Sequence, residues 1–350
     1  MGRRSYGLCE VHDSMGLPLG LVLGLGRYLT TKVLQGERRF PLVLMLEPTH
    51  RCNLFCAGCG RVREYSHKHE VAMSAEACLA SADEADAPVV AVSGGEPLLH
   101  PEIEPILEGL VAQGRFVYLC TNGVLLRDSL DKLPRHPYFS LNVHLDGLAD
   151  AHDHLTGRPG TFDLAMEAIA AAKDAGFRVC TNTTLYKGTD PQEIVELLSR
   201  LTNSGVDGTL LSPAFGYEAV EDDLFLSAEE IHSTFQTLLP RLKRARLMNT
   251  PPYRAFLKGE RELRCSPWGN PTRTPQGWKQ PCYLLTDGYC QSFSQLMEET
   301  DWERFESASD PRCANCKVHS GYETSAVLAM LRPLRWLREG LSLGQRGLCL

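Results

Sequence analysis

The sequence lacks a basic charge balance and a dense set of cysteines, and each absence excludes a class of protein. The 350 residues carry a formal net charge of -7, whereas nucleic-acid-binding proteins usually show a basic balance or a basic stripe. We therefore expect a small-molecule substrate and no nucleic-acid partner. The 13 cysteines are too sparse for a small disulfide scaffold, and their grouping into short clusters favours metal binding.

A membrane-spanning run is also missing. The apolar stretch 15–26 contains Pro18 and several glycines and is too short to cross a bilayer. The N-terminus has no small-residue cleavage site of the secretory type, and Glu10 and Asp13 interrupt its basic leader. We therefore expect a cytoplasmic protein.

Short aliphatic runs alternate with segments of helical period from residue 41 onward. Six of these runs indicate buried strands, at 42–48, 89–94, 116–122, 138–147, 177–186 and 206–213. Repeated βα units of this kind form a parallel sheet, so we predict an α/β fold, a partial (β/α)6 barrel of TIM type. The chemistry of such barrels lies at the carboxyl ends of the strands.

Changes in composition and periodicity divide the chain into four parts. We predict an N-terminal helical segment over 1–40, the (β/α)6 core over 41–250, a small Cys-rich module over 251–326 and a helical tail over 327–350. Both helical segments mix apolar residues with Arg and Lys. We interpret them as helices packed on the barrel, with peripheral membrane contact as the alternative.

Three cysteines follow the first predicted strand, in the segment EPTHRCNLFCAGCG. Cys52, Cys56 and Cys59 form a C-x3-C-x2-C loop, and three thiolates leave one iron of a four-iron cluster free for an exogenous ligand. Structural zinc usually takes four ligands, so a zinc loop completed by His50 is the alternative. The spacing resembles the radical S-adenosylmethionine (SAM) superfamily, which implies a 4Fe–4S cluster with SAM on its open iron. Most members carry an aromatic residue before the last cysteine, where this chain has Gly58.

The second predicted strand ends in SGGEP. Gly94 and Gly95 permit a ligand to approach the backbone closely, and the Glu96 carboxylate suits an ammonium group. The resemblance implies that this motif holds the amino group of SAM. Polar residues at the other strand ends are candidate contacts to SAM or substrate, with turn or cap roles as the alternative. They are Thr121, Asn122, Asn142, His144, Asp146, Asn182 and Thr184.

A second set of cysteines lies in the C-terminal module. Turn signals between Cys265 and Cys282 predict a hairpin that brings their thiols together, and Cys313 and Cys316 follow as a C-x2-C pair. The arrangement resembles the auxiliary-cluster modules called SPASM or twitch, which implies a second 4Fe–4S cluster. A structural zinc and unligated thiols are the alternatives. Two spare ligand candidates lie nearby, Cys290 and His319.

Two further cysteines lie in predicted strands. A thiol S–H bond is weak compared with a C–H bond, so either cysteine can serve as a hydrogen-atom donor to a substrate radical. Cys120 closes the third strand next to the barrel mouth, and Cys180 lies within the fifth. We predict that Cys120 is the donor, with a core position as the alternative for each.

From residue 41 to residue 326 the sequence resembles the adenosyl-hopene transferase family of hopanoid biosynthesis. The resemblance rests on PLVLMLEPTHRCNLFCAGCG, APVVAVSGGEPLLHPEI, FVYLCTNGVLL, PYFSLNVHLDG, CSPWGNPTR, GWKQPCYLL and CANCKVHSGYE. It implies that SAM is consumed, that its 5′-deoxyadenosyl radical adds to the alkene of a triterpene, and that Cys120 reduces the resulting carbon radical. We expect a one-electron reductant such as flavodoxin or ferredoxin.

Three departures from the family pattern fall where a substrate would be selected. Ser320 stands where the family commonly has a cysteine, and the loops 152–163 and 212–225 are altered. We expect both loops to line the substrate space. The alternative function is therefore hydrogen abstraction from a sugar or nucleoside by an epimerase, dehydratase or decarboxylase. A non-catalytic iron–sulfur or zinc protein is the alternative from another class.

Overall fold

Six parallel strands form the centre of the computed structural model, which describes residues 19–65, 71–220 and 223–330. Their bounds are β1 Val43–Leu46, β2 Val89–Val92, β3 Phe116–Thr121, β4 Phe139–His144, β5 Val179–Leu185 and β6 Gly208–Pro213. Each lies within a run that the sequence predicts as a strand, and sequential strands are neighbours in the sheet. The predicted α/β fold with a parallel sheet is confirmed. The strands are shorter than predicted because the polar ends of the runs belong to loops.

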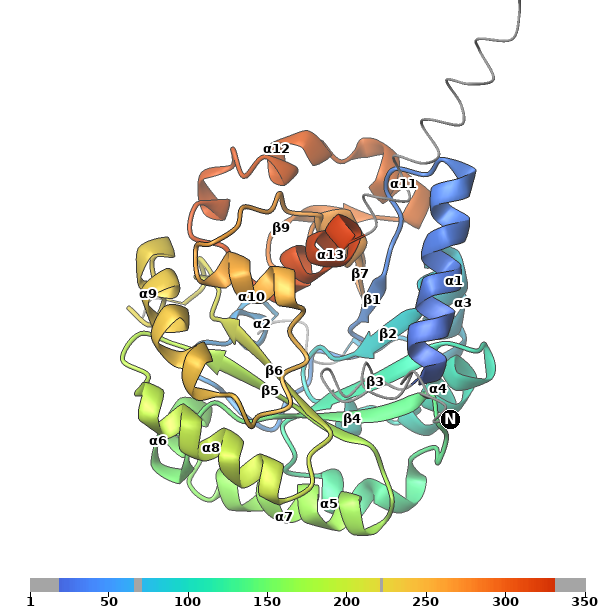
Figure 1. The fold of residues 1–350 in the computed structure, drawn as a ribbon. Coiled ribbons are helices and arrows are strands. Elements are labelled where there is room, and N and C mark those ends of the chain that lie inside the picture. The colour runs from blue at the N-terminus through green and yellow to red at the C-terminus, as the bar shows by residue number, and fades with distance from the viewer. Residues whose placement is uncertain (1–18, 66–70, 221–222, 331–350) are drawn as a thin grey trace, which may run out of the picture.

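Helices connect the successive strands and run around the outside of the sheet (Figure 1). They are α2 Gly60–Glu64, α3 Ala75–Ala85, α4 Ile103–Ala112, α5 Leu126–Ser129, α6 Ala149–Thr156, α7 Thr161–Asp174, α8 Pro191–Asn203 and α9 Ala228–Leu238. The side chains of Ser74, Asp190 and Ser227 accept hydrogen bonds from the first turns of α3, α8 and α9, and such caps fix where a helix begins. Between the helices and the sheet lies a core of aliphatic side chains.

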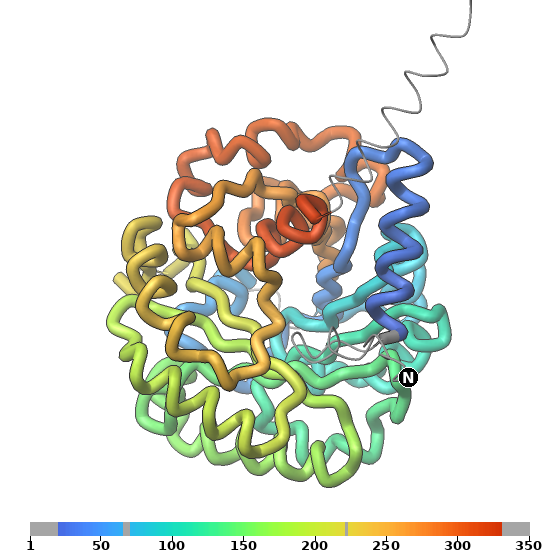
Figure 2. Tube along the Cα trace, in the orientation of Figure 1, coloured from blue at the N-terminus to red at the C-terminus, as the bar shows by residue number. Residues whose placement is uncertain are grey.

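The chain after residue 250 continues the same sheet. Three strands, β7 Thr272–Thr274, β8 Gly277–Pro281 and β9 Thr286–Cys290, extend it to nine, because β7 pairs in parallel with β1. The antiparallel pair of β7 and β8 is the hairpin predicted between Cys265 and Cys282. Figure 2 shows this orange and red part of the chain folding back beside the blue N-terminal part. Its helices are α10 Pro251–Leu257, α11 Phe293–Glu299, α12 Trp302–Glu306 and α13 His319–Met330.

Five short 3-10 helices complete the described secondary structure. They are η1 Pro97–Leu99, η2 Leu130–Lys132, η3 Leu239–Arg241, η4 Pro267–Gly269 and η5 Pro311–Cys313. Two of them lie at predicted site motifs, since η1 begins at the proline of SGGEP and η5 ends at Cys313.

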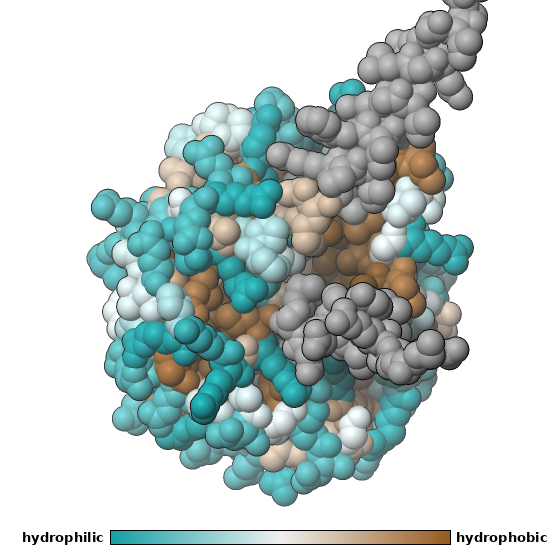
Figure 3. Space-filling model, viewed as in Figure 1, coloured by the Kyte–Doolittle hydropathy of each residue, from teal (hydrophilic) through white to brown (hydrophobic). Residues whose placement is uncertain are grey.

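The predicted N-terminal helix is present as α1, Leu19–Gln35. Its buried side chains Leu29 and Val33 pack on the protein, whereas Leu23 and Leu34 are more than 60% exposed. Figure 3 shows hydrophobic surface where α1 runs. Within 19–65, 71–220 and 223–330, no helix combines the length and apolar character that a membrane span requires. Most of the predicted tail helix, from residue 331 on, and the first 18 residues lie outside the described residues.

Candidate active site

A cavity of about 290 Å³ lies at the carboxyl ends of the strands and brings both predicted barrel motifs together. The expected cluster cysteines come from the loop after β1, SGGEP follows β2, and the polar candidates lie in or directly after the carboxyl-terminal halves of β3, β4 and β5. The predicted residues that line the cavity are Cys52, Cys56, Cys59, Gly94, Gly95, Glu96, Cys120, Thr121, Asn122, Asn142, His144, Asn182 and Thr184. The strand-end rule for barrels therefore predicts the place of the site.

Asp146 is the predicted barrel residue that does not line this cavity. Its side chain is 4% exposed and accepts hydrogen bonds from His144 Nε2 at 2.6 Å and from the Thr184 backbone at 2.7 Å. Burial alone would lower the pKa of His144, but the Asp146 carboxylate outweighs burial, so the pKa of His144 is raised. Asp146 thus orients His144 and Thr184, which line the cavity, although it does not line the cavity itself.

The surroundings of the three loop cysteines disfavour free thiolates and supply hydrogen-bond donors to sulfurs that bind a metal. Burial raises the pKa of Cys52 to about 11 and also raises the pKa of Cys56 and Cys59. Backbone N–H groups of Leu54 and Val62 donate to the sulfurs of Cys52 and Cys59. Buried thiols of this kind ionise on metal binding, and N–H donors stabilise the ligated sulfurs.

The two glycines of SGGEP permit a close approach, but the group that approaches is the cysteine loop. A Cβ on Gly94 would lie 2.5 Å from the Thr49 carbonyl oxygen, and one on Gly95 would lie 2.0 Å from that of Arg51. The Glu96 N–H donates to the Arg51 carbonyl at 2.7 Å. Besides their expected role at a ligand, these glycines thus let the cysteine loop pack directly against SGGEP.

Glu96 is held rigidly at the cavity wall. It is 1% exposed, and it accepts hydrogen bonds from the Thr121 hydroxyl and the Asn122 N–H, both at 2.9 Å. Burial raises its pKa to about 7, against the lowering effect of these donors. Glu96 forms no ion pair with the residues that the structure describes, and a buried carboxylate of this kind suits an incoming ammonium group.

Of the two cysteines within strands, Cys120 lines the cavity and Cys180 does not. The Cys120 sulfur lies 3.6 Å from Asn142 Nδ2, which donates to it. Cys180 is fully buried. The sequence favours Cys120 over Cys180 by its position at the end of the third strand, and the structure places the Cys120 thiol at the cavity.

Several cavity residues carry no sequence signal. Tyr186 and Tyr217, after β5 and β6, close over the glycines on either side of Cys59. A Cβ on Gly58 would lie 2.3 Å from the Tyr186 ring, and one on Gly60 would lie 2.3 Å from the Tyr217 ring. At Gly58, where the superfamily pattern has an aromatic residue, the space is thus filled by the ring of Tyr186, which follows β5.

The two altered loops differ in their relation to the cavity. Residues 212–215 and Tyr217 of the loop after β6 line it, as expected. Loop 152–163 was expected to line it too, and this is wrong for the described structure. It forms the end of α6 and the start of α7, and Thr156, Gly157 and Arg158 line a separate groove on the outer side of the cysteine loop.

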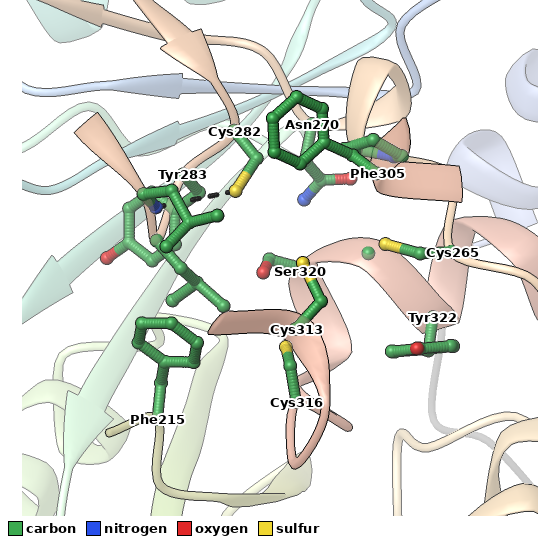
Figure 4. A pocket seen from close by; sticks show the side chains of 14 residues that line it. Phe215, Cys265, Asn270, Cys282, Tyr283, Phe305, Cys313, Cys316, Ser320 and Tyr322 are labelled. Carbon is green, nitrogen blue, oxygen red and sulfur yellow. Dashed lines mark hydrogen bonds between the residues drawn. The ribbon is translucent and has the colours of Figure 1, made fainter. Parts of the chain in front are cut away.

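The second set of cysteines converges on its own cavity in the C-terminal part. Figure 4 shows Cys265, Cys282, Cys313 and Cys316 directed toward a common space, with the Ser320 hydroxyl at its edge. The Leu285 N–H donates to the Cys282 sulfur at 3.4 Å, and burial raises the pKa of Cys316 to about 12. Among the described residues, no three His, Cys, Asp or Glu side chains are arranged to hold a single metal ion.

The spare candidates lie elsewhere. Cys290 is buried on β9, and His319 lines the barrel cavity rather than this one. The two cavities share one wall, because Phe215, Tyr283 and Leu284 line both.

A buried ion network ties the two cysteine sets together. Arg61, two residues after Cys59, lies 2.9 Å from Glu47 and 3.2 Å from Glu64. Its guanidinium also donates to the carbonyl of Tyr283, next to Cys282. Lys279 is fully buried and donates to the same carbonyl at 3.1 Å. Burial lowers the pKa of Lys279 to about 8.

Comparison with known proteins identifies the barrel. Residues 46–201 match the model of the radical SAM superfamily, and residues 209–338 match a domain of unknown function, DUF3463. The barrel part of the chain, residues 46–201, is therefore a radical SAM domain. Members use a 4Fe–4S cluster and SAM, and the cysteine loop, the Glu96 carboxylate and the cavity between them fit both groups.

Curated relatives in the superfamily cover only part of the chain. AdoMet-dependent heme synthase of Methanosarcina barkeri (strain Fusaro / DSM 804) is 32% identical over 42% of this chain and 43% of its own length. GTP 3',8-cyclase of Aquifex aeolicus (strain VF5) is 29% identical over 47% and 54%, and the subtilosin biosynthesis protein AlbA of Bacillus subtilis (strain 168) is 29% identical over 53% and 42%. The chain thus spans about half the length of the curated relatives it matches.

Solved radical SAM structures share the fold. Streptococcus suis SuiB bound to S-adenosylmethionine superposes with a TM-score of 0.64 at 15% identity, over 83% of this chain and 76% of that one. The enzyme anSMEcpe with bound AdoMet gives 0.57 at 17% identity, over 80% and 85%. At such identities the likeness concerns the fold alone.

Proposed function

We propose that this chain cleaves SAM reductively and joins the resulting 5′-deoxyadenosyl radical to an alkene carbon of a hopene-like triterpene. The observation that carries this proposal is the position of Cys120, whose thiol lines the same cavity as the three cluster cysteines and Glu96. A transferase needs such a hydrogen source, because the 5′-deoxyadenosyl group stays in the product and cannot return a hydrogen atom to the substrate radical.

A 4Fe–4S cluster held by Cys52, Cys56 and Cys59 would supply the single electron that breaks the C5′–S bond of SAM and gives methionine and the 5′-deoxyadenosyl radical. Within the chain, Glu96 holds the ammonium group of SAM. The radical forms a C–C bond with one alkene carbon, which leaves the unpaired electron on the other. Cys120 then transfers its hydrogen atom to that carbon. One electron and one proton restore the thiol, and a low-potential donor protein supplies the electron.

The protonation state of Cys120 supports its role as a donor. Burial raises its pKa to about 11, so the side chain carries an S–H bond at neutral pH. Asn142 Nδ2, at 3.6 Å, fixes the sulfur on the cavity side of β3. A thiol that is protonated and held at the cavity wall can deliver a hydrogen atom to a radical in the cavity.

The apolar part of the cavity wall supports a triterpene substrate. Met45, Phe215, Leu284 and Val318 also line the cavity, and apolar substrates bind in pockets lined by such side chains. The exposed Leu23 and Leu34 of α1 support contact with a lipid surface from which the substrate could enter.

A second candidate, hydrogen abstraction from a sugar or nucleoside, is favoured by two polar atoms. Asn182 Oδ1 and His319 Nδ1 are buried and lack a hydrogen-bond partner among the described residues, while both residues line the cavity. Buried polar atoms usually have partners, and a hydroxyl-rich ligand would supply them. One relative is named GTP 3',8-cyclase, which supports a nucleotide-like substrate.

The test is turnover of the cluster-loaded protein with SAM and dithionite in D2O, with diploptene or nucleosides as substrates. We expect mass spectrometry to detect an adenosyl–triterpene adduct with one deuterium on the product carbon, because the thiol hydrogen exchanges with solvent. Cys120→Ala should remove that saturated product, while the matched variant Cys180→Ala, away from the cavity, should retain it. Formation of 5′-deoxyadenosine with nucleosides and no adduct would support the second candidate. Intact clusters without SAM cleavage would support a non-catalytic protein.

A further inference from the structure

Cys52 lies between the interior of the site and the surface. It lines the barrel cavity, and it also lines a groove on the outer side of the cysteine loop. The residues of this outer groove are Arg51, Cys52, Asn53, Leu54, Phe55, Val62, Thr156, Gly157 and Arg158. Only the Cys52 side chain would therefore separate a cluster held by Cys52 from this groove, which gives an electron a short route from outside.

The outer groove is basic and carries an exposed ring. Arg51 and Arg158 are exposed, and among its described lining residues none is acidic. The Phe55 side chain is 59% exposed, and the Arg63 guanidinium lies 4.7 Å from the centre of its ring. Arg63 also donates to the carbonyls of Cys56 and Cys59, both at 2.9 Å. Arg63 thus joins the outer groove to the cysteine loop. The groove is positively charged, whereas the whole chain has a net charge of -7.

The second cysteine set has a comparable groove of a different character. Cys265 lines both the C-terminal cavity and an outer groove. That groove contains three arginines and three glutamates, and two ion pairs join them, Arg39–Glu306 at 2.8 Å and Arg264–Glu303 at 2.6 Å. Its charges balance within the groove. The two surfaces through which an electron could enter therefore differ in electrostatic potential.

We propose that the outer groove at Cys52 is the docking surface for an acidic flavodoxin, which delivers the electron to the barrel site through Cys52. The proposal rests on the reductive SAM cleavage proposed above. Opposite charges steer the two proteins together. The flat Phe55 ring with Arg63 stacked on it fits the exposed edge of a planar flavin. In the transfer, the reduced flavin loses one electron and the oxidised cluster gains it, with no bond made or broken.

The test measures cluster reduction itself, without SAM or triterpene. Reduced flavodoxin is mixed with cluster-loaded protein in a stopped-flow instrument, and the loss of cluster absorbance is followed at several salt concentrations. We expect Arg51→Glu/Arg158→Glu to slow reduction by about tenfold or more at low salt, within the range that electrostatic steering supplies. The wild-type rate should fall as salt rises, and the rate of the variant should not. Reduction of the variant by dithionite should match the wild type, which shows that its cluster is intact.

Arg264→Glu, at the balanced groove of Cys265, is the matched charge reversal, and we expect it to leave the flavodoxin rate unchanged. If Arg264→Glu slows reduction and the double variant does not, electrons enter through the C-terminal site and the proposal is wrong. Faster reduction of the wild type by an acidic ferredoxin than by flavodoxin would overturn the choice of donor. Failure to form a triterpene adduct would not affect these rates, so the two proposals fail separately.

Discussion

Replacement of Arg61 by methionine should destabilise the protein strongly, because it leaves Glu47 without its cation. Glu47 is fully buried, Arg61 is 5% exposed, and their closest atoms are 2.9 Å apart. Removal of one partner from a buried ion pair costs about 3–5 kcal/mol. With an unfolding entropy of about 2.1 cal/mol/K per residue, this loss corresponds to a Tm decrease of roughly 4–7 °C for a chain of this size.

Anaerobic thermal unfolding of the cluster-loaded protein, followed by circular dichroism, measures this effect. Glu47→Gln/Arg61→Met removes both charges and should recover at least half of the lost stability, since the cost arises from the unpaired carboxylate rather than from the lost contact. Arg127→Met is the exposed control. Its pair with Glu167 is 65% and 60% exposed, and its removal should change Tm very little. An equal Tm for Arg61→Met and Arg127→Met would refute the reasoning.

Three further predictions concern the barrel cavity. Gly58→Ala should lower the iron content after reconstitution, measured by metal analysis, because its methyl group would meet the Tyr186 ring at 2.3 Å; normal iron content would contradict this packing. SAM affinity, measured by equilibrium dialysis, should fall about tenfold per pH unit below the Glu96 pKa of about 7, since only the carboxylate pairs with an ammonium group. The affinity should be highest near neutral pH, because the α-amino group of SAM loses its own proton at about pH 7.7–8.0, and Glu96→Gln should remove the loss at low pH. Asp146→Asn should raise the KM for SAM by roughly tenfold through the misplaced His144, whereas an unchanged KM would show that Asp146 serves stability alone.

The cluster motifs could be predicted from sequence because their information is local. Cys52, Cys56 and Cys59 lie within eight residues, so a single loop brings their sulfurs together whatever the rest of the chain does. The parallel sheet then requires the loops after β1, β2 and β3 to meet at one edge. Those two facts place Glu96 and Cys120 beside the loop without any knowledge of side-chain packing.

The choice of Cys120 over Cys180 rested only on position along the strands. Both residues align with Asn142 across β3, β4 and β5, so the alternation of side chains puts them on the same face of the sheet. Only Cys120 lines the cavity. Which residues of that face reach the cavity depends on the packing of the whole barrel, and the alternation does not predict it.

The contacts of Tyr186 and Arg61 were unpredictable for another reason. Their partners, Gly58 and Tyr283, are far away in sequence, and neither pair has a characteristic spacing. A glycine beside a cysteine indicates a close approach but does not identify the group that approaches. Only the arrangement of the loops in space supplies that information.

The pairing of β7 with β1 has a consequence for how the chain acquires its structure. During synthesis β1 leaves the ribosome before the other described strands, and β2 can pair with one of its edges soon afterwards. Its other edge must wait for residues 272–274, with its backbone N–H and C=O groups unsatisfied until then. A free strand edge is a template for pairing with other chains. A chain that stops at residue 250 would keep the β1 edge exposed permanently, so we expect it to self-associate. The barrel and the C-terminal part should therefore fold as one unit.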